Sequence, residues 1–178
     1  METPFENNYF DLFSIEKSYS LDRHLLRDRF RELQSKFHPD NFASATEQDR
    51  RISAQYAAMI NEAFTTLNDP VLRGRYMLSL DGISTDEEHD TRMDPEFLMQ
   101  QIELREELDA ARSSSLDALN HLSAKVESDF AGRIAQVGEI LDGPDDSKLD
   151  KARHLVRELQ FLRRMQNEIE EAEEPFFE

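Results

Sequence analysis

Residues 23–40 read RHLLRDRFRELQSKFHPD, and their pattern is the strongest structural signal in the N-terminal half of the chain. Its apolar residues recur at steps of three or four, which predicts that they share one face of a helix: Leu26, Phe30, Leu33 and Phe37. Pro39 ends this helix near Phe37, because proline disfavours helical geometry in the residue that precedes it. The stretch therefore predicts an amphipathic helix that stops at a His-Pro-Asp turn.

A basic stripe lies on a second face of the same predicted helix. Arg23, Arg27 and Arg31 recur at steps of four residues, so they lie above one another along the helix. A stripe of this kind is, by itself, more often a solvated helix face than a binding surface.

A second amphipathic helix follows the turn. A polar loop over about residues 38–46 leads to Thr46-Glu47-Gln48-Asp49, which resembles a capping box. Beyond it, apolar residues keep helical register as far as Asn68-Asp69-Pro70: Ile52, Tyr56, Met59, Ile60, Ala63 and Leu67. Shorter helices are expected on either side, after Asn7 or Asn8 and from about Val71 to Leu80. Residues 1–80 thus predict an antiparallel helical hairpin with short flanking helices.

The composition changes at residues 81–94, which are polar and acidic and have little to bury. We interpret this segment as a linker between a domain over 1–80 and a domain over 95–178. Three long amphipathic patterns joined by short connections fill the second domain and predict an antiparallel three-helix bundle; they run over about residues 95–111, 114–141 and 147–172. The predicted fold class is all-α.

The charge of the chain excludes several classes of partner. The formal net charge is -17, of which residues 1–80 carry -2 and residues 81–178 carry -15. Such a chain repels phosphate backbones and anionic lipid surfaces, so neither nucleic acid nor a membrane is an expected partner. No stretch approaches the roughly 20 apolar residues of a membrane span, and no signal peptide is evident. These observations predict an intracellular protein, in a bacterial cytoplasm or an organelle interior, and of the two we expect the cytoplasm.

Catalytic and metal chemistry find little support in the sequence. The chain has no cysteine, which excludes disulfides, thiol nucleophiles and cysteine-ligated metal sites within it. His38 beside Asp40 suggests a general base, but no nucleophilic motif accompanies the pair. The remaining histidines match no metal-ligand spacing: His24, His89, His121 and His154. We therefore expect no enzymatic activity, no cofactor and no metal.

The front half of the chain resembles the J-domain family over residues 8–80. The segments that carry the resemblance are YFDLF at 9–13, FHPD at 37–40, and NEAFTTL at 61–67 with Asp69, Pro70, Arg73 and Tyr76 after it. J-domains bind an ATPase of the DnaK class and accelerate its ATP hydrolysis. The resemblance assigns that contact to His38, Pro39, Asp40, Arg27 and Arg31. Many J-domains have a basic residue after the signature, whereas this chain has Asn41, which weakens the positive patch.

The back half resembles the HscB family, J-domain co-chaperones of iron–sulfur cluster assembly. The sequence lacks the Gly/Phe-rich linker and cysteine-rich zinc module of general-purpose J-domain proteins. Instead, residues 97–109 read FLMQQIELREELD and residues 157–162 read RELQFL. The resemblance covers nearly the whole chain, and it implies two partners: an HscA-like ATPase of the DnaK class and the iron–sulfur scaffold protein IscU.

Residues 97–109 also predict a binding surface from their own periodicity. Phe97, Gln101, Leu104 and Leu108 fall in one narrow sector and form the expected core stripe. A second apolar set points well away from that stripe, and acidic residues accompany it: Leu98, Met99 and Ile102, with Glu103 and Glu106. The alternative is that these apolar residues pack against the J-domain or a neighbouring helix.

The HscB resemblance implies that the scaffold binds this second face through Leu98, Met99, Ile102, Glu103 and Glu106. Phe161 is predicted to project off the core stripe of its own helix and to belong to the same surface. Two alternatives remain at this point: a J-domain co-chaperone for a different client, and a non-catalytic helical adaptor in which His-Pro-Asp is only a turn.

Overall fold

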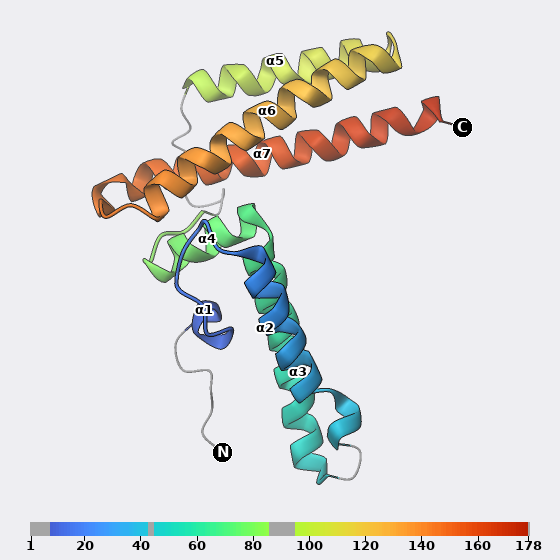
Figure 1. The fold of residues 1–178 in the computed structure, drawn as a ribbon. Helices are drawn as coiled ribbons and strands as arrows, with labels where there is room; N and C mark the ends of the chain where they lie inside the picture. Colours follow the sequence, from blue (N-terminus) through green and yellow to red (C-terminus); the bar gives the residue numbers. More distant parts are fainter. Residues whose placement is uncertain (1–7, 43–44, 86–94, 178) are drawn as a thin grey trace. The chain divides into compact units, whose positions relative to one another are not determined.

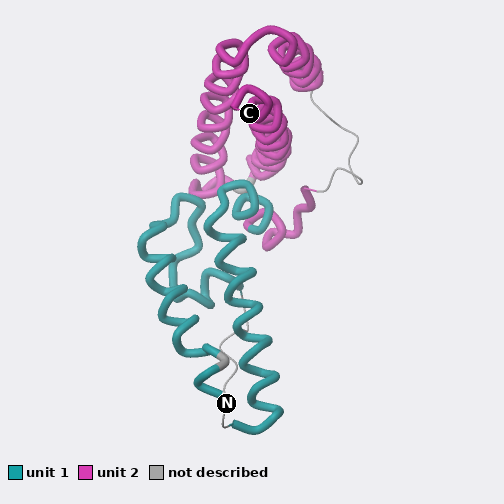
Figure 2. The backbone as a smooth tube through the Cα atoms, turned by 90° about the vertical axis from the view of Figure 1, so that its right-hand side faces the viewer, with its two compact units in different colours: residues 1–76 teal, residues 77–178 magenta. Residues whose placement is uncertain are grey.

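A computed structural model describes residues 8–42, 45–85 and 95–177 of the chain. Within these ranges the chain forms seven α-helices joined by turns and short 3-10 helices, and it has no strand. The predicted all-α class is confirmed. The helices divide into two compact units, residues 1–76 and 77–178, which are described separately (Figure 2).

The first unit is built around an antiparallel helical hairpin. The hairpin consists of α2 (Arg23–Lys36) and α3 (Glu47–Asn68), which lie side by side (Figure 1). The short helix α1 (Tyr9–Leu12) contacts α3, and the 3-10 helix η1 (Pro39–Phe42) occupies the turn of the hairpin. The helix α4 (Pro70–Leu80) follows α3, and the division between the two units falls within it, after Tyr76.

Side chains that accept backbone N–H groups determine where three of these helices begin. The Asn8 side chain caps α1, the Thr46 side chain caps α3, and the Asp22 carboxylate accepts from the N–H groups of Leu25 and His24 at the start of α2. These two hydrogen bonds favour the charged carboxylate and lower the pKa of Asp22 below its usual value. The cap predicted at Thr46 is confirmed, and of the two candidates for the cap of α1, Asn7 and Asn8, the structure has Asn8.

The core of the first unit follows the predicted apolar stripes, except that Met59 is 36% exposed. Leu26 on α2 and Ile60, Ala63 and Leu67 on α3 are fully buried. Towards the turn the two helices are joined by aromatic pairs: Phe30 stacks on Phe64 with ring centroids 4.0 Å apart, and Phe37 packs on Tyr56 at 5.0 Å. The hairpin therefore keeps side-chain packing up to the His-Pro-Asp turn.

The second unit contains three long helices. They are α5 (Pro95–Arg112), α6 (Leu116–Leu141) and α7 (Leu149–Glu173), followed by the 3-10 helix η4 (Glu174–Phe176). The pair α6 and α7 forms the most extensive contact, and α5 packs against both (Figure 1). Most of the apolar stripes are buried: Phe97, Leu104 and Leu108 on α5, Leu119, Val126, Phe130 and Val137 on α6, and Ala152, Leu155, Leu159, Leu162 and Ile169 on α7. Gln101 on α5 and the terminal residues Leu116 and Leu141 of α6 are half-buried.

The limits of the two domains stay a prediction. Most of the predicted linker, residues 86–94, lies outside the described residues. We expect residues 95–178 expressed alone to give a helical circular dichroism spectrum and a cooperative thermal transition, because α5, α6 and α7 bury their apolar stripes against one another. A fragment of residues 77–178 is the matched control. A random-coil spectrum from 95–178 beside a helical one from 77–178 would contradict the predicted boundary.

Candidate functional site

The His-Pro-Asp segment lies in the turn that joins α2 to α3. Helix α2 ends at Lys36, Phe37 is its C-cap, and η1 begins at Pro39. The side chain of His38 is 58% exposed and that of Asp40 is 90% exposed. Neither side chain contributes to the core, so both are available to a partner.

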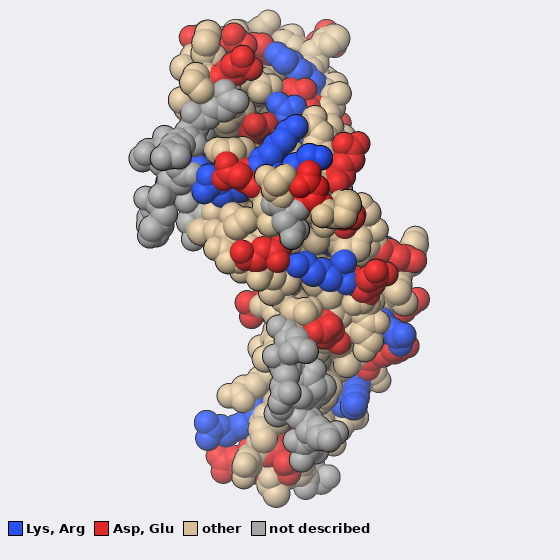
Figure 3. All heavy atoms as spheres, turned by 90° about the vertical axis from the view of Figure 1, so that its left-hand side faces the viewer, with Lys and Arg blue, Asp and Glu red and all other residues tan. Residues whose placement is uncertain are grey.

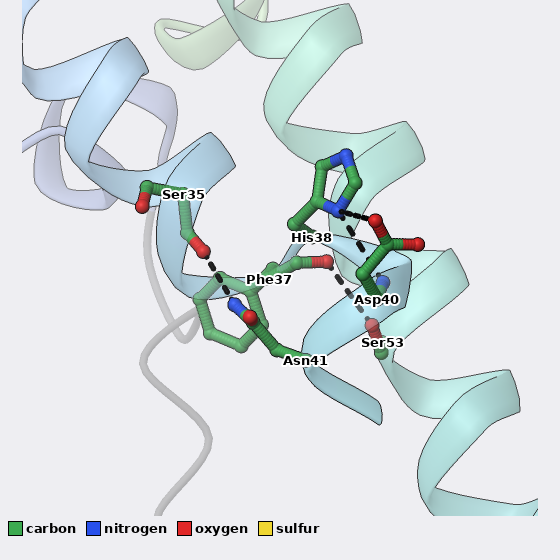
Figure 4. Close-up of polar contacts among 6 residues, drawn as sticks. All are labelled: Ser35, Phe37, His38, Asp40, Asn41 and Ser53. Carbon is green, nitrogen blue, oxygen red and sulfur yellow. Dashed lines mark hydrogen bonds and ion pairs between the residues drawn. The ribbon is translucent and has the colours of Figure 1, made fainter. Parts of the chain in front are cut away.

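The two exposed side chains are arranged by a local hydrogen bond. The backbone N–H of Asp40 donates to Nδ1 of His38 over 3.3 Å, and a carboxylate oxygen of Asp40 lies 3.6 Å from the same nitrogen (Figure 4). When Nδ1 accepts this hydrogen bond, the neutral imidazole carries its hydrogen on Nε2. In that form the turn offers a donor, the Nε2–H of His38, beside an acceptor, the carboxylate of Asp40.

Two further side chains hold the end of α2 at this turn. The amide nitrogen of Asn41 donates to the carbonyl of Ser35 over 2.7 Å, and the hydroxyl of Ser53 on α3 donates to the carbonyl of Phe37 over 3.1 Å (Figure 4). Sequence reasoning missed Ser53. Its signal was a polar residue seven positions before Ile60, in the buried register of α3, where Ser53 is only 2% exposed.

The arginine stripe divides into residues with different surroundings. The guanidinium of Arg23 donates to the carbonyl of Asn68 over 2.7 Å and so joins α2 to the end of α3. Arg27 and Arg31 are exposed, and Arg31 lies 3.6 Å from the carboxylate of Asp28. An exposed pair of this kind contributes little to stability, so the stripe near the turn remains available to an acidic partner.

The outer face of α5 carries the predicted second apolar set. The exposed fractions are 41% for Leu98, 64% for Met99 and 58% for Ile102, and both Glu103 and Glu106 are exposed. The structure therefore does not show these three apolar residues packed against a neighbouring helix. We call these five residues the α5 face.

The prediction for Phe161 was wrong in one respect. Its side chain is only 2% exposed and does not project from the core. Instead its ring meets the ring of Phe97 edge-on, with centroids 5.7 Å apart, and the guanidinium of Arg105 lies 6.0 Å from its centroid. The reason is that α7 contacts both α6 and α5, so its buried sector is wider than one stripe. Phe161 supports α5 from beneath.

Polar contacts also fix α5 on α6 and α7. The amide of Gln100 donates to Asp129 on α6 over 3.3 Å, and Arg133 on α6 lies 3.5 Å from Gln100 while also pairing with Glu158 on α7. Lys125 on α6 pairs with Glu107 on α5 at 2.7 Å. These contacts join residues on three helices and set the rotation of α5, which determines that the α5 face is outward.

We also searched the described residues for a metal site and for a membrane-spanning helix. Among these residues no group of three or more His, Cys, Asp or Glu side chains is placed to hold a metal ion. None of the helices in the same part of the chain is long and apolar enough to cross a membrane. On the face shown in Figure 3, acidic and basic side chains are interspersed. The two exposed sets, the His38 turn and the α5 face, are therefore the candidate surfaces.

Comparison with known proteins gives the same family in sequence and in structure. Residues 93–170 match the family model described as the HSCB C-terminal oligomerisation domain. The co-chaperone protein HscB homolog of Shewanella woodyi is 45% identical over 174 residues, which cover 96% of this chain and 99% of that protein. A homolog from Vibrio vulnificus is 42% identical over 172 residues, with the same coverage.

Solved structures of HscB proteins have the same fold. Chaperone HscB from Vibrio cholerae superimposes with a TM-score of 0.83 and 40% identity, over 94% of this chain and 98% of that one. Human co-chaperone protein HscB superimposes with a TM-score of 0.88 and 25% identity, over 97% of this chain and 85% of that one. The chain therefore belongs to the HscB family of non-catalytic co-chaperones.

Proposed function

We propose that this chain stimulates the ATPase of an HscA-like chaperone of the DnaK class and delivers an IscU-type iron–sulfur scaffold protein to it, in the bacterial cytoplasm. The His38 turn with Arg27 and Arg31 binds the chaperone, and the α5 face binds the scaffold. The observation that carries the proposal is that each unit exposes one set of side chains suited to one of these partners. The first unit exposes the His38 turn, and the second unit exposes the α5 face.

The chaperone contact is electrostatic and directional. Arg27 and Arg31 attract an acidic surface, which speeds encounter and orients the turn. The Asp40 carboxylate accepts charge-assisted hydrogen bonds from an arginine of the chaperone, while the Nε2–H of His38 donates to an acceptor beside it. The chain supplies no group to ATP itself; it acts by binding more tightly to the hydrolysing conformation of the chaperone.

The scaffold contact combines apolar burial with charge. Leu98, Met99 and Ile102 expose apolar area that a partner can cover, and covering it supplies most of the affinity. Glu103 and Glu106 at the edge of the set pair with basic groups of the scaffold and fix its orientation. Phe161 contributes from beneath, because it holds Phe97 and Arg105 in place.

One chain that binds both partners raises the concentration of the scaffold near the chaperone. Two binding surfaces in one chain can produce an effective concentration of about a millimolar, well above that of free proteins in dilute solution. Delivery therefore needs no chemistry from the co-chaperone. It needs both surfaces in one molecule.

Reconstitution with purified proteins tests the proposal. ATP hydrolysis by an HscA-class ATPase is measured with the full chain, with an IscU-type scaffold, and with both. We expect the chain alone to accelerate hydrolysis, and both proteins together to accelerate it more than either alone. If the chain accelerates hydrolysis but the scaffold neither binds nor adds to the effect, it serves a different client. If it accelerates nothing, it is an adaptor and the proposal is wrong.

A further inference from the structure

The last carbonyl groups of a helix have no partner within the helix and need donors from elsewhere. At the end of α2 these carbonyls flank the His38 turn, and two of them are satisfied by side chains. Asn41, which lies in η1, donates to Ser35 over 2.7 Å, and Ser53, which lies across the turn on α3, donates to Phe37 over 3.1 Å.

The two donors belong to different elements, Asn41 to η1 and Ser53 to α3. Asn41 follows the signature in the chain and ties η1 back to α2, and its own backbone N–H donates to the carbonyl of His38 over 3.0 Å. Ser53 is fixed by the packing of α3 and is 2% exposed. Together these hydrogen bonds join the end of α2 both to the η1 segment of the His-Pro-Asp turn and to α3 (Figure 4).

Asn41 follows the His-Pro-Asp signature directly. A lysine or arginine at this position would add positive charge. A long side chain of that kind, extended into solvent, could not donate to the carbonyl of Ser35 as Asn41 does. Instead, the side-chain amide of Asn41 donates to the carbonyl of Ser35, and the backbone N–H of Asn41 donates to the carbonyl of His38. Its contribution to function is therefore expected to be geometric.

We propose that Asn41 and Ser53 are positioning residues that hold the His38 turn in its chaperone-binding conformation before the chaperone arrives. The proposal rests on the proposed function of the turn. Because the side chains of both residues donate to backbone carbonyls at the end of α2, each acts by raising the fraction of molecules whose turn can bind the chaperone. Apparent affinity falls by the fraction of molecules in which the turn is competent, whereas the maximal rate at saturation does not.

The test uses the full chain with Asn41→Ala and Ser53→Ala, each in a separate variant. We expect the concentration for half-maximal ATPase stimulation to rise in each variant while the plateau is retained. Losing one hydrogen bond shifts the equilibrium of the turn by about 5-fold, which is the upper limit of that rise. In the absence of chaperone, amide hydrogen exchange at Asp40 and Asn41 should also accelerate, because the open form of the turn becomes more populated. The two backbone N–H groups report the turn directly, since both donate to His38.

Asn61→Ala is the matched control. Asn61 is also an exposed asparagine on the hairpin, and its side chain accepts a hydrogen bond from Gln34 on α2 over 3.3 Å, away from the turn. This variant should leave the half-maximal concentration and exchange at the turn unchanged. Equal shifts in Asn61→Ala and Asn41→Ala would show a general loosening of the hairpin and would overturn the proposal.

The remaining outcomes separate this inference from the proposed function. The inference would be overturned if amide hydrogen exchange at the turn were unchanged in both alanine variants. It would also be overturned if exchange became faster while the concentration for half-maximal ATPase stimulation stayed the same. A lower plateau with an unchanged half-maximal concentration would also overturn it. A wild-type chain that stimulates no such ATPase would overturn the proposed function, and the inference with it.

Discussion

A His38→Gln variant is expected to lose ATPase stimulation while its melting temperature stays within a few degrees of wild type. The imidazole is 58% exposed and contributes nothing to the core, and exposed substitutions usually change stability by about 0.5 kcal/mol or less. The glutamine side chain is flexible and lacks the rigid ring that holds Nδ1 at the N–H of Asp40 while Nε2 is exposed. Thermal unfolding by circular dichroism and steady-state ATP hydrolysis measure the two properties on one protein.

Asp40→Asn should give the same pattern, because it removes the charge that an arginine of the chaperone binds. His24→Gln is the matched control, since His24 is an exposed histidine in the first turn of α2, at the other end of that helix; it should stimulate like wild type. A His38→Gln variant that stimulates as well as wild type would refute the role of the turn. One that unfolds would show that the motif is structural.

Replacing Leu98, Met99 and Ile102 together with alanine should weaken scaffold binding by at least about 100-fold, because apolar residues at an interface centre are each worth on the order of 1–2 kcal/mol. The melting temperature should fall by only a few degrees, since all three side chains are 41% exposed or more and lose little on truncation. Calorimetric titration with a purified IscU-type scaffold measures the affinity. Stimulation of the ATPase without scaffold should survive, because the His38 turn is in the other unit.

Leu104→Ala on the same helix is the control with the opposite expectation. Leu104 is 1% exposed, so its truncation should cost about 2–5 kcal/mol of stability and lower the melting temperature by many degrees. If the triple variant also melts far below wild type, the α5 face is part of the core and the scaffold-binding proposal fails. Phe161 is left out of the triple variant because it is buried and its loss would change stability as well as binding.

The helices and their buried faces were predictable from the sequence. Steps of three and four residues placed Leu26, Ile60 and Leu104 on faces that the structure buries, because the helical period is a local property of the chain. Caps at Asn8 and Thr46 are equally local, since each binds N–H groups within three residues of itself. The outward direction of Leu98 and Ile102 follows from the same periodicity once the core stripe of α5 is known.

Tertiary structure alone decided where contacts form between distant parts of the chain. Phe161 is buried because α5 and α6 both cover α7, and the period of one helix does not tell how many neighbours it has. Ser53 reaches the carbonyl of Phe37 only because α2 and α3 are paired in one register, and Gln100 meets Arg133 only after α5 and α6 have packed. A hydrogen bond across helices depends on positions accurate to a fraction of an ångström, which packing sets and which no pattern along the chain encodes.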